Sequence, residues 1–234
     1  MNWTIKESYD KGKARWLFGL RKDLKLRSLY FLAFREKYLA KVNNILTHIP
    51  WLIIDLGCNA WDKTCSLLRV FPERKILWVD IHRDSIALWK ERFSGNDNVE
   101  IKIWDALELS QIVKQKVACI FTSQMMHHFT EDERGKSLRE AFLTLSEWGI
   151  LIISDTFMTE DSTLGLELKK IYMKRAGTNA YHNTSPEQMK AEWENAWFHL
   201  LEKIDSFPIF ERATWFYPTT MLIFQKPASP EDPL

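Results

Sequence analysis

Short apolar runs alternate along this chain with stretches whose apolar residues recur every three or four positions. The runs lie at 51–54, 75–80, 99–103, 117–123 and 149–154, and each is predicted to be a β-strand. The stretches between them have helical spacing, for example 62–71, 83–93 and 131–146. Parallel neighbours need such crossover connections, so the pattern predicts an α/β fold with a mostly parallel sheet and helices on both faces.

The first strand and the helix after it form the unit that is most informative about function. The strand leads into Asp55, then Gly57 and a short turn, and Asp62 opens the helix. A glycine in such a turn lets a ligand approach the backbone closely, and the helix N-terminus offers it free N–H groups. The unit therefore predicts a ligand site.

Polar residues follow the other strands as well. Right-handed crossovers bring the carboxyl ends of parallel strands to one edge of the sheet, where ligands bind in the crevice outside. The candidates at this edge are Asp55, Asp80, Asp105, Gln124, His127, His128 and Asp155.

The two ends of the chain depart from the alternation. Residues 1–47 have a helical pattern and predict an N-terminal helical cap, and residues 1–41 carry eleven Lys and Arg against four Asp and Glu. This basic cap could pack on the domain with a solvated charged face, lie on a membrane surface, follow nucleic acid phosphates or cover an active site. Beyond Asp155, helices are expected at 164–174 and 186–201, strands at 201–207 and 219–226, and a disordered tail at 227–234.

Composition narrows the class of protein. The 234 residues carry a formal net charge of +1 and are 46% hydrophobic, which suits one ordinary globular core and implies no polyelectrolyte partner. The sequence has no apolar run of membrane-spanning length and no signal-peptide pattern, so a cytoplasmic location is expected. The three cysteines lack CxxC or metal spacing, as expected for reduced thiols and no metal site. The many aromatic residues either fill the core or line a cavity.

The order of parts and the string IIDLGCNAW resemble the class I S-adenosylmethionine-dependent methyltransferases, over roughly residues 48–226. The resemblance implies a doubly wound, seven-stranded sheet whose last two strands form an antiparallel hairpin. Asn59 and Trp61 stand where the family usually has glycines. Asn tolerates positive φ, whereas Trp61 would either swing outward as a lid or fill the pocket.

The resemblance also implies S-adenosylmethionine as cofactor and assigns residues to it. Asp80 would accept hydrogen bonds from the ribose hydroxyls, Ile81 would lie on the adenine face, and Asp105 with Ala106 would meet the adenine amino group. An aromatic residue of the opening helix, Tyr9 or Trp16, would close over the cofactor. The implied cofactor-binding set is Tyr9, Asp55, Gly57, Cys58, Asn59, Asp80, Ile81, Asp105, Ala106 and Gln124.

The segment SQMMHHF resembles the stretch after strand four that faces the substrate in many small-molecule methyltransferases. Either His127 or His128 would then act as the base, because imidazole exchanges protons near neutral pH. Alternatively both histidines are structural, one capping the helix that begins near Thr130 and one bonded to the backbone. The resemblance makes 156–199 the variable insertion that shapes substrate choice, with Tyr172, Tyr181 and His182 as polar-tipped candidates.

Three functions are compatible with these residues. The leading hypothesis is transfer of a methyl group to oxygen or nitrogen of a small, aromatic or apolar metabolite. A second is a protein that kept the fold, lost methyl transfer and serves as a binding or partner subunit, or catalyses another reaction. Nucleic acid methylation is the third, although the chain lacks the NPPY-type motif of amino-methylating enzymes. The sequence does not indicate an oligomeric state.

Overall fold

The computed structural model describes residues 36, 38–46, 52–58, 65–156, 185–195, 197–205 and 219–228. Outside this part of the chain lie most of the predicted cap, the predicted helix at 164–174 and the end of the predicted tail. The strands are β1 (Leu52–Leu56), β2 (Ile76–Asp80), β3 (Val99–Ile103), β4 (Val117–Ser123), β5 (Leu145–Thr156), β6 (His199–Asp205) and β7 (Thr219–Gln225). The α-helices are α3 (Cys65–Val70), α4 (Arg83–Arg92), α5 (Leu109–Ile112), α6 (Glu131–Thr144) and α8 (Pro186–Asn195), and the 3₁₀ turns are η2 (Ala106–Glu108) and η3 (Met126–His128).

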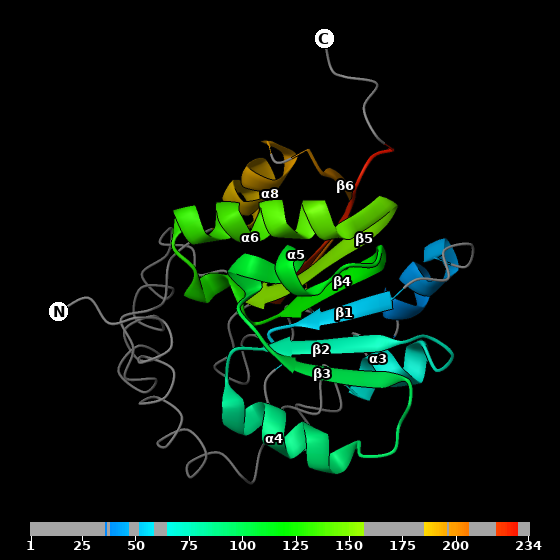
Figure 1. Ribbon diagram of the computed structural model, residues 1–234. Coiled ribbons are helices and arrows are strands. Elements are labelled where there is room, and N and C mark those ends of the chain that lie inside the picture. Colours follow the sequence, from blue (N-terminus) through cyan, green and yellow to red (C-terminus); the bar gives the residue numbers. More distant parts are fainter. Residues whose placement is uncertain are drawn as a thin grey trace, which may run out of the picture.

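The strands form one sheet in the order β3-β2-β1-β4-β5-β7-β6 (Figure 1). The first five strands are parallel, whereas β7 runs antiparallel to both β5 and β6. The expected mostly parallel sheet with a C-terminal antiparallel hairpin is thus confirmed. The order changes direction between β1 and β4, and in such sheets ligands bind outside the carboxyl ends of the strands at that point.

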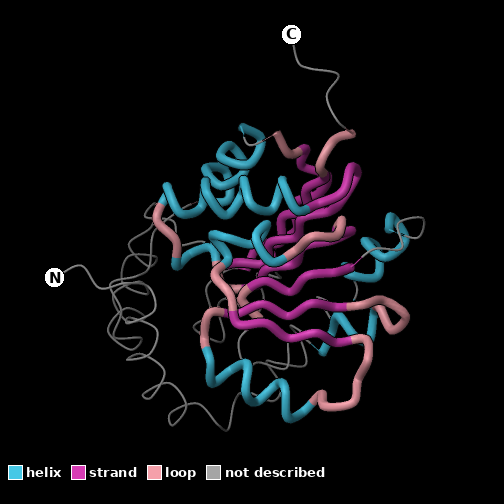
Figure 2. The backbone as a smooth tube through the Cα atoms, in the orientation of Figure 1, coloured by secondary structure: helices cyan, strands magenta, loops and turns pink. Residues whose placement is uncertain are grey.

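Helices cover both faces of the sheet (Figures 1 and 2). One core lies between the sheet and α5, α6 and α8, with Leu109, Leu138 and Trp193 among its buried residues. The other lies against α3, α4 and the helical residues 38–46. Because they are covered on both faces, β1 and β2 are buried at every position, which explains their continuous apolar runs.

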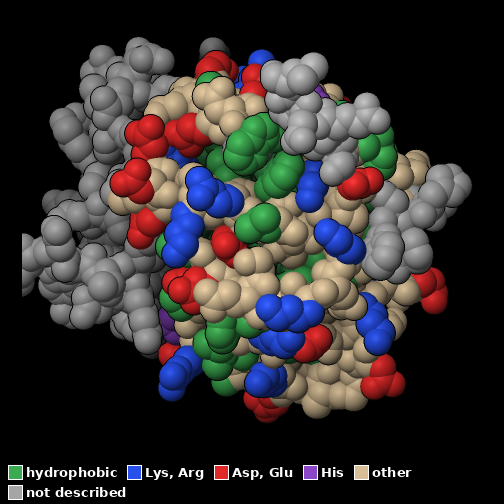
Figure 3. Space-filling model, turned by 45° about the horizontal axis from the view of Figure 1, so that its top comes forward, with side chains coloured by type: hydrophobic (Ala, Val, Ile, Leu, Met, Phe, Trp, Pro, Cys, Tyr) green, Lys and Arg blue, Asp and Glu red, His purple; other side chains and the backbone are tan. Residues whose placement is uncertain are grey.

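Aromatic residues fill these cores where the structure describes them. The Trp78 ring packs edge-on against Trp89 and Phe93, and Trp193 stacks on Phe224 with ring centroids 5.1 Å apart. Figure 3 shows that some hydrophobic side chains nevertheless remain exposed between charged ones on the face that it draws.

The helix predicted at 186–201 is too long, because α8 ends at Asn195 and β6 begins at His199. Trp197 adopts φ 68° and its N–H donates to the carbonyl of Glu194, while the N–H of Phe198 donates to the carbonyl of Trp193. These two bonds form a Schellman motif, which ends a helix by reversing the backbone into the left-handed region. The apolar spacing of Trp193 and Trp197, which resembles a continuing helix, therefore spans the helix end.

Candidate functional site

The turn after β1 requires glycine for two reasons. Gly57 has φ 73°, and a Cβ at this position would lie 2.5 Å from Sδ of Met125. Its N–H donates to the carbonyl of Val79 at 2.8 Å, and the N–H of Cys58 reaches the same oxygen at 3.3 Å. Gly57 therefore lies at the end of β2 and directly beside the segment that follows β4.

Two acidic side chains organise the exits of β2 and β3. The buried Asp80 accepts a hydrogen bond through Oδ1 from the N–H of His82 at 2.8 Å. Asp105 caps η2, its Oδ1 accepting from the N–H of Leu107 at 2.9 Å. The N–H of Trp104 donates to the Asp80 carbonyl at 3.1 Å, which holds the two loops side by side. Next to these acids, Ile81 is exposed and Ala106 is buried.

The thiol of Cys58 lies in an acidic and buried environment. Burial raises its pKa well above the ordinary thiol value, and the carboxylates of Asp55 and Asp80 raise it further. The thiol stays protonated at neutral pH, so Cys58 contributes packing at this site and no nucleophile.

The exit of β4 carries the two histidines. Gln124 adopts φ 57° and its N–H donates to the carbonyl of Ser154 at 2.9 Å, after which the chain enters η3. His127 is 4% exposed; its Nδ1 lies 2.5 Å from Oδ1 of Asp155, and its backbone N–H donates to Oδ2 at 3.3 Å. An ionised carboxylate only accepts hydrogen bonds, so Nδ1 of His127 is the donor in this contact.

The cap of helix α6 and the contacts of the two histidines bear on their structural alternative. Helix α6 is capped by Thr130 in a reciprocal capping box with Glu133, so no histidine is needed as its cap. Nδ1 of His127 contacts the carboxylate of Asp155, and the His128 ring lies 4.1 Å from the His127 ring between centroids. A buried histidine oriented by a buried acid is an arrangement common to many catalytic sites.

The sequence analysis places Asp155 at the correct edge of the sheet but does not pair it with a histidine. A signal was present, because β4 and β5 were expected to lie in one parallel sheet and each ends on polar residues. Ser123 pairs in register with Ser154, which brings the segment after β4 beside Asp155. Only the observed adjacency of the two strands, however, identifies which histidine it contacts.

Those predicted site residues that the structure describes lie along one edge, at the exits of β3, β2, β1, β4 and β5. Backbone hydrogen bonds link the β1 exit to β2 and the β2 exit to β3. The close approach of Met125 to Gly57 links β1 to β4, and the contact between His127 and Asp155 links β4 to β5. Tyr9, Trp16, Asn59, Trp61, Tyr172, Tyr181 and His182 lie outside the described residues.

Two features are absent from the described part of the chain. Within it, no three His, Cys, Asp or Glu side chains gather in a way that could hold a metal ion. Among its helices, none has the length and apolarity needed to cross a bilayer.

Comparisons with known proteins agree on the kind of domain. A family model described as a methyltransferase domain matches residues 53–149. Among curated proteins none matches the sequence. Solved structures do match: the N-methyltransferase NodS from Bradyrhizobium japonicum WM9, solved with S-adenosyl-L-homocysteine, superposes with a TM-score of 0.65 at 13% identity, covering 94% of this chain and 99% of NodS.

Two further structures share the fold. The magnesium protoporphyrin IX methyltransferase ChlM from Synechocystis PCC 6803, with bound S-adenosylhomocysteine, gives a TM-score of 0.66 at 13% identity, covering 93% of this chain and 95% of ChlM. The cyclopropane synthase MmaA2 from Mycobacterium tuberculosis gives 0.61 at 12% identity, covering 80% and 84%. Residues 53–149 therefore match a methyltransferase domain, and the seven-stranded sheet has the fold of the S-adenosylhomocysteine-bound methyltransferases NodS and ChlM.

Proposed function

We propose that this protein transfers a methyl group from S-adenosylmethionine to an oxygen or nitrogen atom of a small, aromatic or apolar metabolite. The observation that carries the proposal is the contact between His127 and Asp155 at the exits of β4 and β5. It provides an oriented base at the edge where the cofactor residues gather.

The residues at the exits of β1, β2 and β3 fit the cofactor. Asp80 supplies a carboxylate for the ribose hydroxyls, and hydrogen bonds to a charged acceptor contribute about 1.5–3 kcal/mol each. Asp105 and Ala106 would lie at the adenine and Ile81 on its face. The turn of Gly57 and Cys58 would receive the amino acid end, with Asp55 and Gln124 beside it.

S-adenosylmethionine, when bound, supplies an electrophilic methyl group on a sulfonium. The acceptor must lose a proton as its oxygen or nitrogen attacks, and Nε2 of His127 would take that proton. Asp155 keeps the other nitrogen protonated and stabilises the imidazolium that forms. Alignment of the two reactants supplies most of the rate, about 7–11 kcal/mol, and the base about 10²–10⁴-fold.

The proposed class of substrate is inferred from two structural neighbours and from the base. NodS and ChlM are named as methyltransferases, and ChlM acts on magnesium protoporphyrin IX. An acceptor that must be deprotonated suits a base held by Asp155.

Calorimetric titration with S-adenosylhomocysteine tests the cofactor site. We expect saturable binding, and we expect Asp80→Ala to weaken it about 10–100-fold, the equivalent of one charge-assisted hydrogen bond. Asp84→Ala is the matched control, because Asp84 is an exposed acid four residues further on, in the first turn of α4. No binding at millimolar ligand would contradict the proposal and favour the altered, non-methylating protein.

Methyl transfer to a panel of phenols, alcohols and amines tests the base. His127→Asn should lower the rate about 10²–10⁴-fold and leave cofactor affinity unchanged. His199→Asn, on the exposed edge strand β6, is the control. Should His127→Asn retain full activity with an accepted substrate, His127 is not the base. Affinity for nucleic acid that falls steeply with salt would instead support the third hypothesis.

A further inference from the structure

Arg134 is a buried cation next to the turn that carries the histidines. It lies in the first turn of α6 and is only 2% exposed. Its Nη1 donates to the carbonyl oxygen of Phe129 at 3.0 Å, and Phe129 directly follows η3. The guanidinium therefore holds the downstream end of the turn whose upstream part is held by Asp155.

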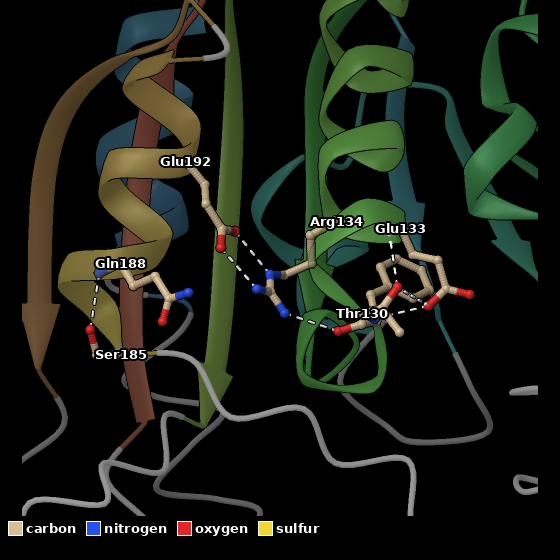
Figure 4. A network of polar contacts seen from close by, with 7 residues as sticks. Thr130, Glu133, Arg134, Ser185, Gln188 and Glu192 are labelled. Carbon is tan, nitrogen blue, oxygen red and sulfur yellow. Dashed lines mark hydrogen bonds and ion pairs between the residues drawn. The ribbon is translucent and has the colours of Figure 1, made fainter.

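The other N–H groups of Arg134 bind a residue that is 58 positions away in the sequence. Nε and Nη2 donate to the two carboxylate oxygens of Glu192 at 2.9 and 2.8 Å, a bidentate pair from α6 to α8 (Figure 4). Helix α8 begins at a Ser185 cap, whose Oγ accepts from the N–H of Gln188 at 3.0 Å. Phe129 and Glu192 together fix the guanidinium from both sides.

Helix packing alone does not require this arrangement. A buried ion pair gives little net stability relative to apolar residues of similar volume, because both charges must be desolvated. Its advantage is geometric, since a planar guanidinium bound at three nitrogens permits one orientation only. The guanidinium orients the Phe129 carbonyl, which lies two residues after His127 and one after His128.

We propose that Arg134 and Glu192 act as a positioning pair, which sets the placement of the His127–His128 turn from helix α8. The inference rests on the proposed role of His127 as base. Helix α8 directly follows residues 157–184, most of the insertion that the resemblance links to substrate choice, so the pair joins the base to that part of the chain.

Imidazole signals in ¹⁵N NMR test the proposal without a substrate. Two variants weaken the pair conservatively: Glu192→Gln keeps an acceptor but removes the charge, and Arg134→Lys keeps the charge but loses the fork. The matched control is Glu194→Gln, whose carboxylate is on the same helix in an exposed pair with Lys190 at 3.5 Å. Unfolding midpoints and affinity for S-adenosylhomocysteine are measured on the same samples.

We expect both variants to displace the signals of His127 and His128, with cofactor affinity unchanged and the Glu194→Gln spectrum like wild type. With an accepted substrate, kcat should fall up to about 100-fold while the KM for the cofactor is preserved. A lower unfolding midpoint with unchanged imidazole signals would overturn the proposal and leave a purely structural pair. If Glu192→Gln does not fold, Glu192→Asp, which keeps the charge on a shorter stem, decides by the same signals.

The design separates two kinds of failure. Absence of cofactor binding by the wild type would refute the proposed function. Unmoved histidine signals in a protein that binds the cofactor would refute only the positioning role.

Discussion

At the scale of single residues, Gly57 shows how one position combines backbone and packing requirements. Its φ of 73° is in the region that L-residues rarely adopt, and Met125 occupies the place of a Cβ. Gly95 has a similar φ of 86° but nothing within 4 Å of its virtual Cβ. The two glycines thus differ in packing and share the backbone conformation.

The difference in packing predicts that alanine is tolerated less well at Gly57 than at Gly95. Gly95→Ala should cost about 1–2 kcal/mol of unfolding free energy for the left-handed backbone, and Gly57→Ala should cost about 1–3 kcal/mol more through the contact with Met125. Urea denaturation measures both. Adding Met125→Ala to Gly57→Ala should remove part of the extra cost; equal losses at the two glycines would show that Met125 yields freely.

At the scale of elements, the end of α8 depends on a residue in an unusual conformation. Trp197 occupies the left-handed position of a Schellman motif, where glycine is commonest, and Trp193 and Phe198 make the apolar contact that accompanies the motif, with ring centroids 6.1 Å apart. The Trp197 side chain is 57% exposed and touches the Phe142 ring.

A pair of substitutions at Trp197 isolates the backbone term. Both Trp197→Ala and Trp197→Gly lose the indole and its contact with Phe142, but only alanine keeps a Cβ in the left-handed region. We expect the glycine variant to be more stable than the alanine variant by about 1 kcal/mol in thermal or urea unfolding. An alanine variant that is equally stable would mean that the helix end has rearranged.

The sequence predicted the elements well where burial controls the pattern. The runs at β1, β2 and β4 are apolar because both faces are covered, and β1 to β4 lie within two residues of their predicted bounds. The fifth strand was predicted too short, because β5 spans Leu145–Thr156 rather than 149–154. The predicted end of α8 was wrong, because the backbone reverses at Trp197 and tryptophan has no intrinsic preference for the left-handed conformation. The spacing of apolar residues indicates which side of an element is buried, but it does not indicate the φ angle of any residue.

At the scale of the whole molecule, buried thiols link stability to pH. Burial raises the pKa of Cys119 in β4, and the nearby Arg74 guanidinium offsets only part of that effect. Burial likewise raises the pKa of Cys58. Above about pH 8.5 an unfolded chain releases these protons and the folded protein retains them, so stability falls as the pH rises.

The loss of stability at alkaline pH can be measured. Between neutral pH and about pH 10, the Cys119 thiol should cost the wild type about 2 kcal/mol of unfolding free energy that Cys119→Ala does not lose. Urea denaturation of both proteins at each pH gives the difference. Parallel losses in the two proteins would show that the thiol ionises equally in the folded and unfolded states.

The sequence by itself determined the order of strands and helices and the edge where their polar exits gather, while the cofactor came from its resemblance to a family. These follow from local patterns, namely apolar runs, a glycine turn and acids at strand ends. Only the tertiary structure decided that His127 contacts Asp155 and that Arg134 contacts Glu192, pairs separated by 28 and 58 positions. Such contacts depend on which strands and helices become neighbours, and that is settled by burial of the whole sheet rather than by any single segment.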